Sequence, residues 1–483
     1  MATFYWVGGS GTWDNANTVN WSATSGGAGG AGVPSAASLD VAIFDANSGS
    51  GTCTVASTAS VRSITFGASG IVLDIAADFA LGGGSVVFTA GTINLNSHTL
   101  TSLAFNTDGS TARTINFGTG KIVLTLNGGT VWNSISQTNF SCTGSRRVES
   151  VYSGSSGTRE FFFASSSGGV EANSVSLYVI GGSDTISFRG RVNDLSFSGF
   201  TGTFNATVTG TLVYGNLNLS PGMAFNGTTV SFLSTSTGKT VTFGGVTMNA
   251  NVAFSGVGGG WVLQDNLSIS TSLTLTLTAG TLDANGNNVS IGNFALGAGT
   301  KTLTLGSGTW SVAGANWNAN TNVANLTVSP SAGIISMTSA SGKTFAGGAK
   351  VWPTLNQGGA GALTIQQSNS FANITNTVQP ATITLTAGTT QTVAAFGVSG
   401  TAGNLITLNS STAGTRATLS DSVGTVEVSN VLIQDINATG GATWNAFLKT
   451  GNVDAGNNSG WDFFPAVRQV FGQVFSSIFR PIF

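Results

Sequence analysis

The sequence predicts an all-β protein whose body is an elongated parallel β-solenoid, or β-helix, built from stacked coils. Three observations favour this fold class: short runs of strand-forming residues, turns rich in glycine and asparagine between them, and an internal repeat. Val, Ile, Thr and Phe favour strands, whereas runs of the helix formers Ala, Leu, Glu and Lys are nearly absent. The alternative is a series of tandem antiparallel β-sandwiches, which also place a turn every 8–12 residues or so.

The composition is that of a folded chain with very little charge. Charged residues make up 7% of the 483 positions, against about 25% in an ordinary soluble protein. A hydrophobic content of 41% and a net charge of -2 are opposite to the signature of disorder. A nucleic-acid partner is not expected, because binding to phosphates requires a face rich in Lys and Arg.

The body of the chain, from about residue 52 to about 430, alternates short strands with turns. Many of the strands alternate apolar and polar residues with period two, as half-buried strands do. Gly and Asn at the turns supply the positive φ that tight corners need. Examples of the predicted strands are Ser63–Phe66, Ile122–Leu126, Thr240–Phe243 and Leu273–Leu277.

An internal repeat indicates that this body is duplicated. The order of the repeated motifs is kept, with an insertion in the first copy, which predicts modules at 51–205 and 206–430. Coils of roughly 20–25 residues would share one continuous core when they stack. The matching pairs are Ala90–Asn96 with Ala279–Asn285, Lys121–Leu126 with Lys301–Leu305, and Gly129–Trp132 with Gly308–Trp310.

The two ends of the predicted body differ from its middle. Residues 1–50 carry Trp6, Trp13 and Trp21 in a Gly-rich setting, which predicts an apolar cap over the open end of the stack. An aromatic platform that binds sugar would have a similar composition. Residues 431–464 are predicted to form the cap at the other end. We expect no secretory signal peptide and no membrane-spanning helix, because the chain lacks the basic start and the long apolar run that these require.

Residues 465–483 predict an amphipathic helix that docks onto another molecule. Pro465 suits a first helical position and Pro481 ends the run. The apolar residues follow the spacing of one helical face, and such a face needs a partner in water. Insertion into a membrane is not expected, because the polar face lacks lysine clusters. The predicted docking residues are Val467, Val470, Phe471, Val474, Phe475, Ile478 and Phe479.

Charged residues concentrate between residues 146 and 194, in a chain that is otherwise nearly uncharged. Two interpretations are open: mixed charges that pair across a subunit contact, or a groove that binds a surface receptor. The residues predicted to bind at the surface in the second case are Arg146, Arg147, Arg159, Glu160, Arg189 and Arg191.

Residues that could carry chemistry are few, and we expect no enzyme, no metal site and no cofactor. His98 is the single histidine and fits a turn. Cys53 and Cys142 are far apart and are interpreted as two separate thiols. A glycosidase would need a pair of acids that face one groove. The acids dense enough to supply such a pair are Glu149, Glu160, Glu171, Asp184 and Asp194, and neighbouring arginines could neutralise them.

Several motifs together resemble β-repeat structural proteins of tailed bacteriophages and prophages, of the fibre, spike or decoration type. The resemblance extends over most of residues 1–464, and related stretches are similar to the repeats of bacterial autotransporter adhesins. This group is poorly defined and supplies no catalytic residues. The motifs are Tyr5–Trp13 with Asn20 and Trp21, then Gly400–Leu408, Ile433–Asp435, Gly440–Trp444 and Asp454–Trp461.

The resemblance implies a structural role on a virion, either in adhesion to the host surface or in particle architecture. The expected partners are other virion proteins, copies of the same chain in a trimer, and a glycan of the host surface. The expected location is the virion. A bacterial surface adhesin and a glycan-cleaving tailspike are the two alternatives.

Overall fold

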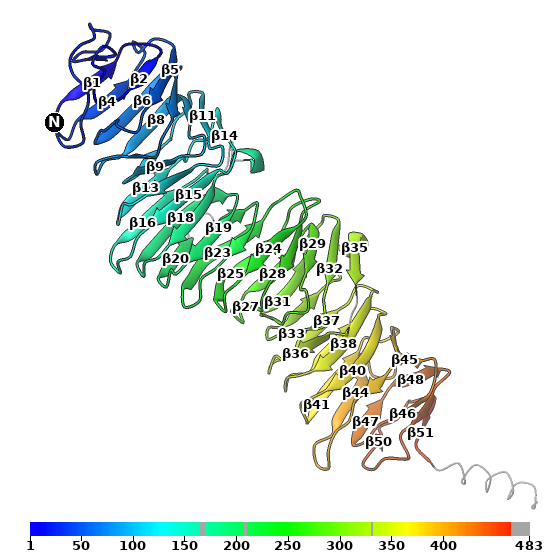
Figure 1. Cartoon of the computed structure of the whole chain (residues 1–483). Coiled ribbons are helices and arrows are strands. Elements are labelled where there is room, and N and C mark those ends of the chain that lie inside the picture. Colours follow the sequence, from blue (N-terminus) through cyan, green and yellow to red (C-terminus); the bar gives the residue numbers. More distant parts are fainter. Residues whose placement is uncertain (165–169, 207–209, 330–331, 465–483) are drawn as a thin grey trace, which may run out of the picture. The chain divides into compact units, whose positions relative to one another are not determined.

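The computed structural model describes residues 1–164, 170–206, 210–329 and 332–464 of the chain. Within these ranges the structure is all-β, apart from two short 3-10 helices, η1 (Glu171–Asn173) and η2 (Val323–Asn325). The strands form a parallel β-solenoid of about 18 turns, and successive coils lie side by side along the chain (Figure 1). The predicted solenoid is confirmed and the sandwich alternative is wrong. The helix predicted at 465–483 lies outside the described residues.

The chain divides into two compact units, Met1–Trp261 and Val262–Phe483. The passage from one unit to the other falls within β26 (Gly260–Leu263). Each unit is described by itself below. The module limits inferred from the internal repeat remain a prediction.

In the first unit each coil contributes to three rows of parallel strands, and long strands bend to serve two rows. β6 (Ser63–Ile75), β8 (Val86–Asn94), β18 (Thr185–Val192), β23 (Ala224–Phe232) and β25 (Thr247–Phe254) run through the first row and then the second. The first row also holds β1 (Thr3–Trp6), β4 (Val41–Phe44), β10 (Phe105–Asn106), β13 (Gly129–Asn133), β16 (Thr158–Phe162) and β20 (Thr203–Ala206). The second row also holds β2 (Gly11–Trp13), β5 (Gly51–Val55), β11 (Arg113–Asn116), β14 (Phe140–Thr143) and β21 (Thr211–Val213). The third row holds β7 (Phe79–Ala80), β9 (Thr99–Ser102), β12 (Lys121–Leu124), β15 (Arg147–Val151), β17 (Ser176–Ile180), β19 (Leu195–Ser198), β22 (Leu217–Asn218) and β24 (Lys239–Thr242).

The second unit repeats this plan with shorter strands. One row holds β27 (Leu267–Ile269), β30 (Val289–Ile291), β33 (Thr309–Val312), β36 (Ile334–Met337), the later parts of β38 (Val351–Gln357) and β40 (Ser370–Asn376), and β43 (Phe396–Gly397). The next row holds β28 (Thr274–Leu277), β31 (Asn293–Leu296), β34 (Asn316–Asn318), β37 (Lys343–Ala346), β39 (Leu363–Gln366), β41 (Ala381–Leu385), β44 (Ile406–Ser410), β47 (Val431–Gln434) and β50 (Val453–Asp454).

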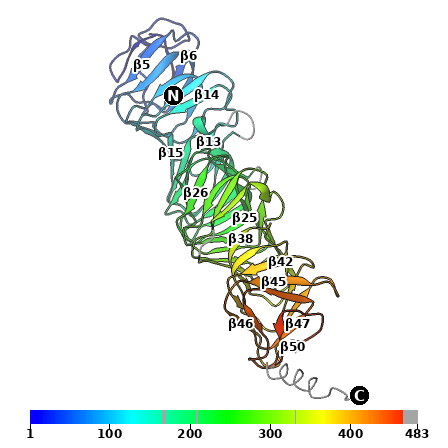
Figure 2. The same cartoon turned by 90° about the vertical axis from the view of Figure 1, so that its right-hand side faces the viewer.

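The remaining strands of the second unit fall into three groups. β29 (Gly280–Asp283), β32 (Lys301–Thr304) and β35 (Leu326–Ser329) pair in that order. The early parts of β38 and β40 pair with each other and lead to β42 (Thr390–Val393), β45 (Ala417–Asp421) and β48 (Ile436–Gly440). β42 and β45 are seen side by side in Figure 2. A separate sheet holds β46 (Thr425–Glu427), β49 (Thr443–Asn445) and β51 (Trp461–Asp462).

The core of each unit is a stack of apolar side chains that point inward from successive coils. Burial alternates residue by residue along β18, as a strand with one buried face requires. Because the pairing is parallel and in register, Phe44, Phe66 and Phe88 lie over one another, with ring centroids 5.3 and 5.4 Å apart. In the second unit Phe294 and Trp317 stack with centroids 4.2 Å apart. The aromatic stacks specify the register in which strands of successive coils pair, because a polar outer face alone specifies register weakly.

Much of the outer face carries ladders of polar side chains that hydrogen-bond from one coil to the next. Asn116 donates from Nδ2 to Oδ1 of Asn94, 2.8 Å away and 22 residues earlier in the chain. Thr143 then donates to Asn116 over 2.9 Å. The same arrangement joins Asn226 to Asn205 and Asn249 to Asn226. Each ladder uses the coil spacing to satisfy amides without charge, which accounts for the low content of charged residues.

The three N-terminal tryptophans form a closed apolar cluster at the first coil. Trp6, Trp13 and Trp21 are fully buried, and each ring lies within about 6 Å of Phe44. β3 (Trp21–Ser22) runs antiparallel along the edge of β1 that β4 leaves open, and a covered edge cannot recruit another strand. Because no ring face is exposed, these residues act as a cap and not as a platform for sugar.

Candidate functional site

The charged segment of the first unit is organised around a buried ion pair. Nε of Arg159 lies 2.8 Å from Oδ2 of Asp184, and both side chains are fully buried. Nη2 of Arg159 donates to Oδ1 of Asp184 over 2.9 Å, and Nη1 donates to Oγ of Ser150 over 2.9 Å. This bidentate geometry satisfies the guanidinium inside the coil. Arg159 was predicted to bind at the surface, but its burial gives it no access to a surface partner.

A second group of charges lies at the outer face of the third row. The carboxylate of Glu149 lies 3.0 Å from Nζ of Lys121 and 2.7 Å from Nε of Arg147. The guanidinium of Arg147 also stacks on the ring of Tyr178, with 3.8 Å from its central carbon to the centroid. The two cations are a little over a third exposed and the carboxylate is nearly buried. The group is thus internally neutralised, with one net positive charge toward solvent.

The other predicted surface residues are spread over several rows and contact different partners. Arg146 donates from Nη1 to the carbonyl oxygen of Glu171 over 2.8 Å. Glu160 accepts a hydrogen bond from the hydroxyl of Thr130. In β18, Arg189 lies over the ring of Phe162 in the first row, and Arg191 donates to the hydroxyl of Tyr214. The structure therefore does not gather the six predicted residues into one groove.

The acids of this segment are engaged by donors or cations. Burial raises the pKa of Glu171, yet the hydrogen bonds from Thr235 and Ser234 outweigh it and hold that pKa below its ordinary value. Asp194 accepts from the backbone N–H of Asn216 over 2.7 Å and from the hydroxyl of Ser176. Glu149 and Asp184 are held in ion pairs.

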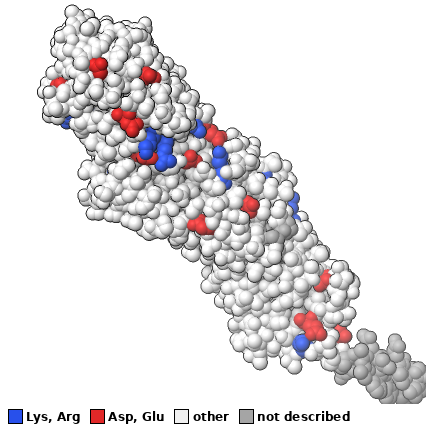
Figure 3. Space-filling view, viewed as in Figure 1, with Lys and Arg blue, Asp and Glu red and all other residues white. Residues whose placement is uncertain are grey.

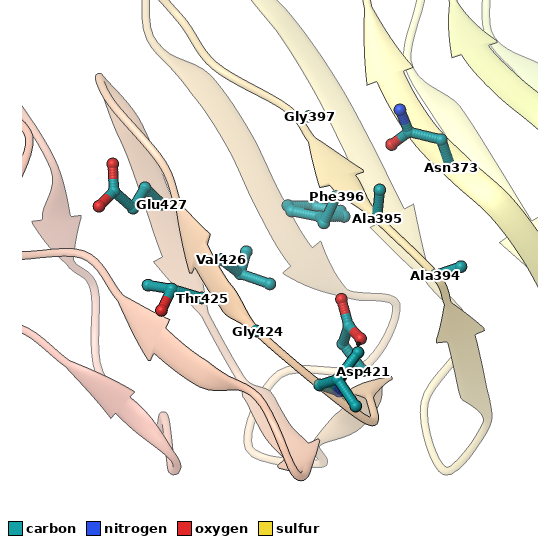
Figure 4. A pocket seen from close by; sticks show the side chains of 11 residues that line it. Asn373, Ala394, Ala395, Phe396, Gly397, Asp421, Gly424, Thr425, Val426 and Glu427 are labelled. Atoms are coloured by element: carbon teal, nitrogen blue, oxygen red, sulfur yellow. Dashed lines mark hydrogen bonds between the residues drawn. The ribbon is translucent and has the colours of Figure 1, made fainter.

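A pocket in the second unit is the site that the sequence did not indicate. It has a volume of about 470 Å³ and lies between β43 and β46. Figure 4 shows it from close by. Its lining residues are Asn373, Ala394, Ala395, Phe396, Gly397, Asp421, Val423, Gly424, Thr425, Val426 and Glu427.

The pocket is a break in the ladder between two successive coils. On one side of it β42 pairs with β45 as far as Thr392 and Ser420. On the other side the N–H of Gly400 donates to the carbonyl oxygen of Ser429 over 2.8 Å. Between these points β43 pairs with β40 and β46 pairs with β49, but no hydrogen bond in the described residues joins β43 to β46. The two strands separate, and the pocket opens in the gap.

The walls of the pocket combine a buried carboxylate with apolar side chains. Asp421 is 3% exposed, and its carboxylate points toward the space between Phe396 and Val426 (Figure 4). Phe396 and Val426 are buried beneath that space, whereas Val423 is 71% exposed beside it. Glu427 is held by Lys449 at 3.3 Å. The pocket therefore presents one acidic group that has no cation beside it.

The sequence carried no clear signal for this pocket. Asp421 ends a strand with ordinary alternation, and the segment 422–425 reads as one more turn. The gap arises because β43 and β46 do not pair with each other, and the pairing of strands that are distant in the chain is not visible in a local pattern. The exposed Val423 is the one local oddity, and single exposed apolar residues are common in proteins.

The remaining candidate groups are two cysteines and the single histidine. Cys53 and Cys142 are buried free thiols, and burial raises the pKa of Cys142 to about 12. His98 lies in the turn between β8 and β9, with Nδ1 3.7 Å from Oδ1 of Asp78. Across the described residues, no group of His, Cys, Asp and Glu side chains could hold a metal ion. In the same part of the chain no helix has the length and hydropathy needed to span a membrane.

Comparisons with protein-family models, with curated proteins and with solved structures gave no match to this chain.

Proposed function

We propose that this chain is a structural protein of a bacteriophage virion, an appendage that acts in adhesion to the host surface or in particle architecture. The observation that carries the proposal is the outer face of the solenoid, where Asn, Thr and Ser ladders replace charge. Figure 3 shows how sparse charged groups are on one face. Such a surface suits a rigid part that must stay folded outside the cell, because its polar groups are satisfied without ion pairs that salt would screen.

The engaged acids of the first unit support a non-catalytic role over that of a glycan-cleaving tailspike. A hydrolase needs an acid that can give its proton to the leaving group, whereas Glu149, Glu171 and Asp184 are engaged by cations or hydrogen-bond donors of the chain itself. The resemblance of the sequence to phage β-repeat proteins supports the same proposal. In this proposal other virion proteins and further copies of the chain, in a trimer, are its partners.

The direct test is to locate the chain on particles. An antibody raised against the folded chain would be applied to particles released by cells that carry its gene, and the label would be viewed by electron microscopy. Label on the heads or tails of virions is the expected result. Label on the cell envelope with none on virions would overturn the proposal and favour the alternative, a bacterial surface adhesin.

The docking role of residues 465–483 belongs to the same proposal. A chain that ends at Phe464 should keep the β-rich circular dichroism of the full chain but lose its association with copies of itself or with virions, as measured by sedimentation. A full-length variant with Phe471→Ser and Phe475→Ser should behave like the truncated chain, because it keeps the length and removes the apolar face. If both variants assemble like the full chain, this segment does not dock.

A further inference from the structure

The pocket between β43 and β46 has the chemistry of a binding site for an uncharged sugar, and we infer that it takes one saccharide unit. This inference goes beyond the proposed structural role, because it assigns a ligand class to residues in the second unit. It depends on the pocket alone and not on where the chain is located.

The first argument comes from two hydrogen-bonding groups to which the fold gives few or no partners. Asp421 is almost fully buried, and the one hydrogen bond that its carboxylate accepts from the described residues comes from the N–H of Val423, at 3.3 Å. Oδ1 of Asn373 is also buried and has no partner in the described residues. Buried polar atoms nearly always have partners, so the unpartnered amide oxygen of Asn373 and a carboxylate with a single long hydrogen bond, in the wall of one pocket, indicate a bound molecule that supplies donors.

The second argument comes from the backbone of the two separated strands. The carbonyl oxygen of Ala395 accepts from the N–H of Ile374 on the β40 side. Because backbone groups alternate sides along a strand, the N–H and the carbonyl oxygen of Phe396 face the gap. On β46 the carbonyl oxygen of Gly424 accepts from Thr443 of β49, so the backbone groups of Thr425 also face the gap. Each edge therefore offers one donor and one acceptor.

These groups together match a sugar better than other small ligands. Sugar hydroxyls both donate and accept, and two neighbouring hydroxyls can donate to one carboxylate. The apolar Phe396 and Val426 can contact the C–H face of a pyranose ring. Anionic ligands are disfavoured because no Lys or Arg lines the pocket, and the volume of about 470 Å³ lies in the range of small-molecule sites.

The test is binding of simple sugars to the full chain by saturation-transfer difference NMR. The probes are D-glucose, D-galactose, D-mannose and N-acetyl-D-glucosamine at millimolar concentrations. N-acetylneuraminic acid serves as the anionic probe and tetramethylammonium as the cationic probe. We expect at least one neutral sugar to bind with saturation, and neither charged probe to bind.

Three variants locate the binding. Asp421→Asn keeps the shape of the side chain and removes its charge, so the affinity should fall about tenfold or more, as for the loss of a charge-assisted hydrogen bond. Gly397→Val should abolish binding by filling the gap; a Cβ there would lie 3.3 Å from Cγ2 of Thr375, a close contact that this side chain must relieve by a small shift, so the fold of this variant is checked by circular dichroism. Asp283→Asn is the matched control, since Oδ1 of Asp283 also accepts from the N–H two residues later but lies outside the pocket.

The possible results separate clearly. Weaker binding in both pocket variants, with Asp283→Asn unchanged, supports the site. The inference is overturned if no neutral sugar binds the folded wild-type chain, if only tetramethylammonium binds, or if both pocket variants keep the wild-type affinity. All sugar-binding measurements use the isolated chain. A chain that binds no sugar would therefore not contradict the virion proposal, and antibody label on virions would not support the sugar site.

Discussion

The buried pair of Arg159 and Asp184 gives the sharpest stability prediction. Replacing Arg159 with Met keeps an unbranched stem but removes the guanidinium, which leaves the carboxylate of Asp184 inside the coil without its cation. Both side chains are fully buried in the wild-type chain, so water cannot take over the lost hydrogen bonds. Breaking a buried pair from one side typically costs about 3–5 kcal/mol, and we expect Arg159→Met to fall in this range.

A second substitution, Asp184→Asn, separates the free-energy cost of the unpaired charge from the contribution of the ion pair itself. In the double variant Arg159→Met with Asp184→Asn no charge remains buried, because the asparagine is neutral and keeps the shape of the aspartate. The double variant should therefore be more stable than Arg159→Met alone, even though it carries one more change. Ser150 loses its donor from Arg159 in both variants, so this loss cancels in the comparison.

The assay is unfolding in urea, followed by tryptophan fluorescence and circular dichroism, with midpoints compared at equal slopes. A second signature comes from pH. Burial without a cation disfavours the charged form of a carboxyl group, so the cost of Arg159→Met should be present at neutral pH and shrink in acid, where the charge is neutralised. The reasoning is refuted if the two substitutions destabilise additively, or if the gap between wild type and Arg159→Met does not narrow as the pH falls.

Three further predictions concern single positions. Burial lowers the pKa of Lys343 from 10.5 to about 8, so between pH 8 and pH 10.5 the unfolded chain binds more protons than the folded chain. The stability of the wild type relative to Lys343→Met should therefore rise as the pH increases through this window. The measurement is the Tm of both chains across this pH range. Phe66→Ala removes a fully buried ring from the stack and should cost about 3–5 kcal/mol in urea unfolding, whereas Thr65→Ala on the same strand should cost under about 0.5 kcal/mol. Gly118→Ala should destabilise the chain more than Gly238→Ala in urea unfolding. Both glycines have a positive φ, but the new Cβ would lie 1.9 Å from a backbone oxygen at position 118 and in open space at position 238.

Local patterns in the sequence predicted the strands and turns well. The predicted strand Leu273–Leu277 corresponds to β28, and the predicted start at Ser63 is the first residue of β6. The repeated motif that ends in Asn96 and Asn285 gives both asparagines a positive φ, 57° and 52°, as its turn chemistry required. These features depend on neighbours along the chain, and the sequence contains that information.

Features that depend on residues distant in the chain were harder to predict from the sequence. Period two could not separate a solenoid from a sandwich, because both bury alternate residues of short strands. The internal repeat did not predict in which row a strand lies. The matching residues Gly91 and Gly280 lie in β8 and β29, and these two strands belong to different sheets. Arg159 and Asp184 are 25 residues apart, so nothing local marked them as a buried pair. The row in which a residue lies depends on the length of every coil before it.

The position of the pocket follows from how this surface avoids charge. Where coils stack in register, many outward amides and hydroxyls find a partner one coil away, as Asn116 does with Asn94, and groups paired in this way are not available to a ligand. Where neighbouring coils do not pair, as between β43 and β46, backbone groups of both strands lack these partners. A buried carboxylate at such a break can hydrogen-bond a ligand because the ladder no longer occupies it. In a solenoid held by polar ladders, we therefore expect binding sites at the breaks in the ladder and not along its regular faces.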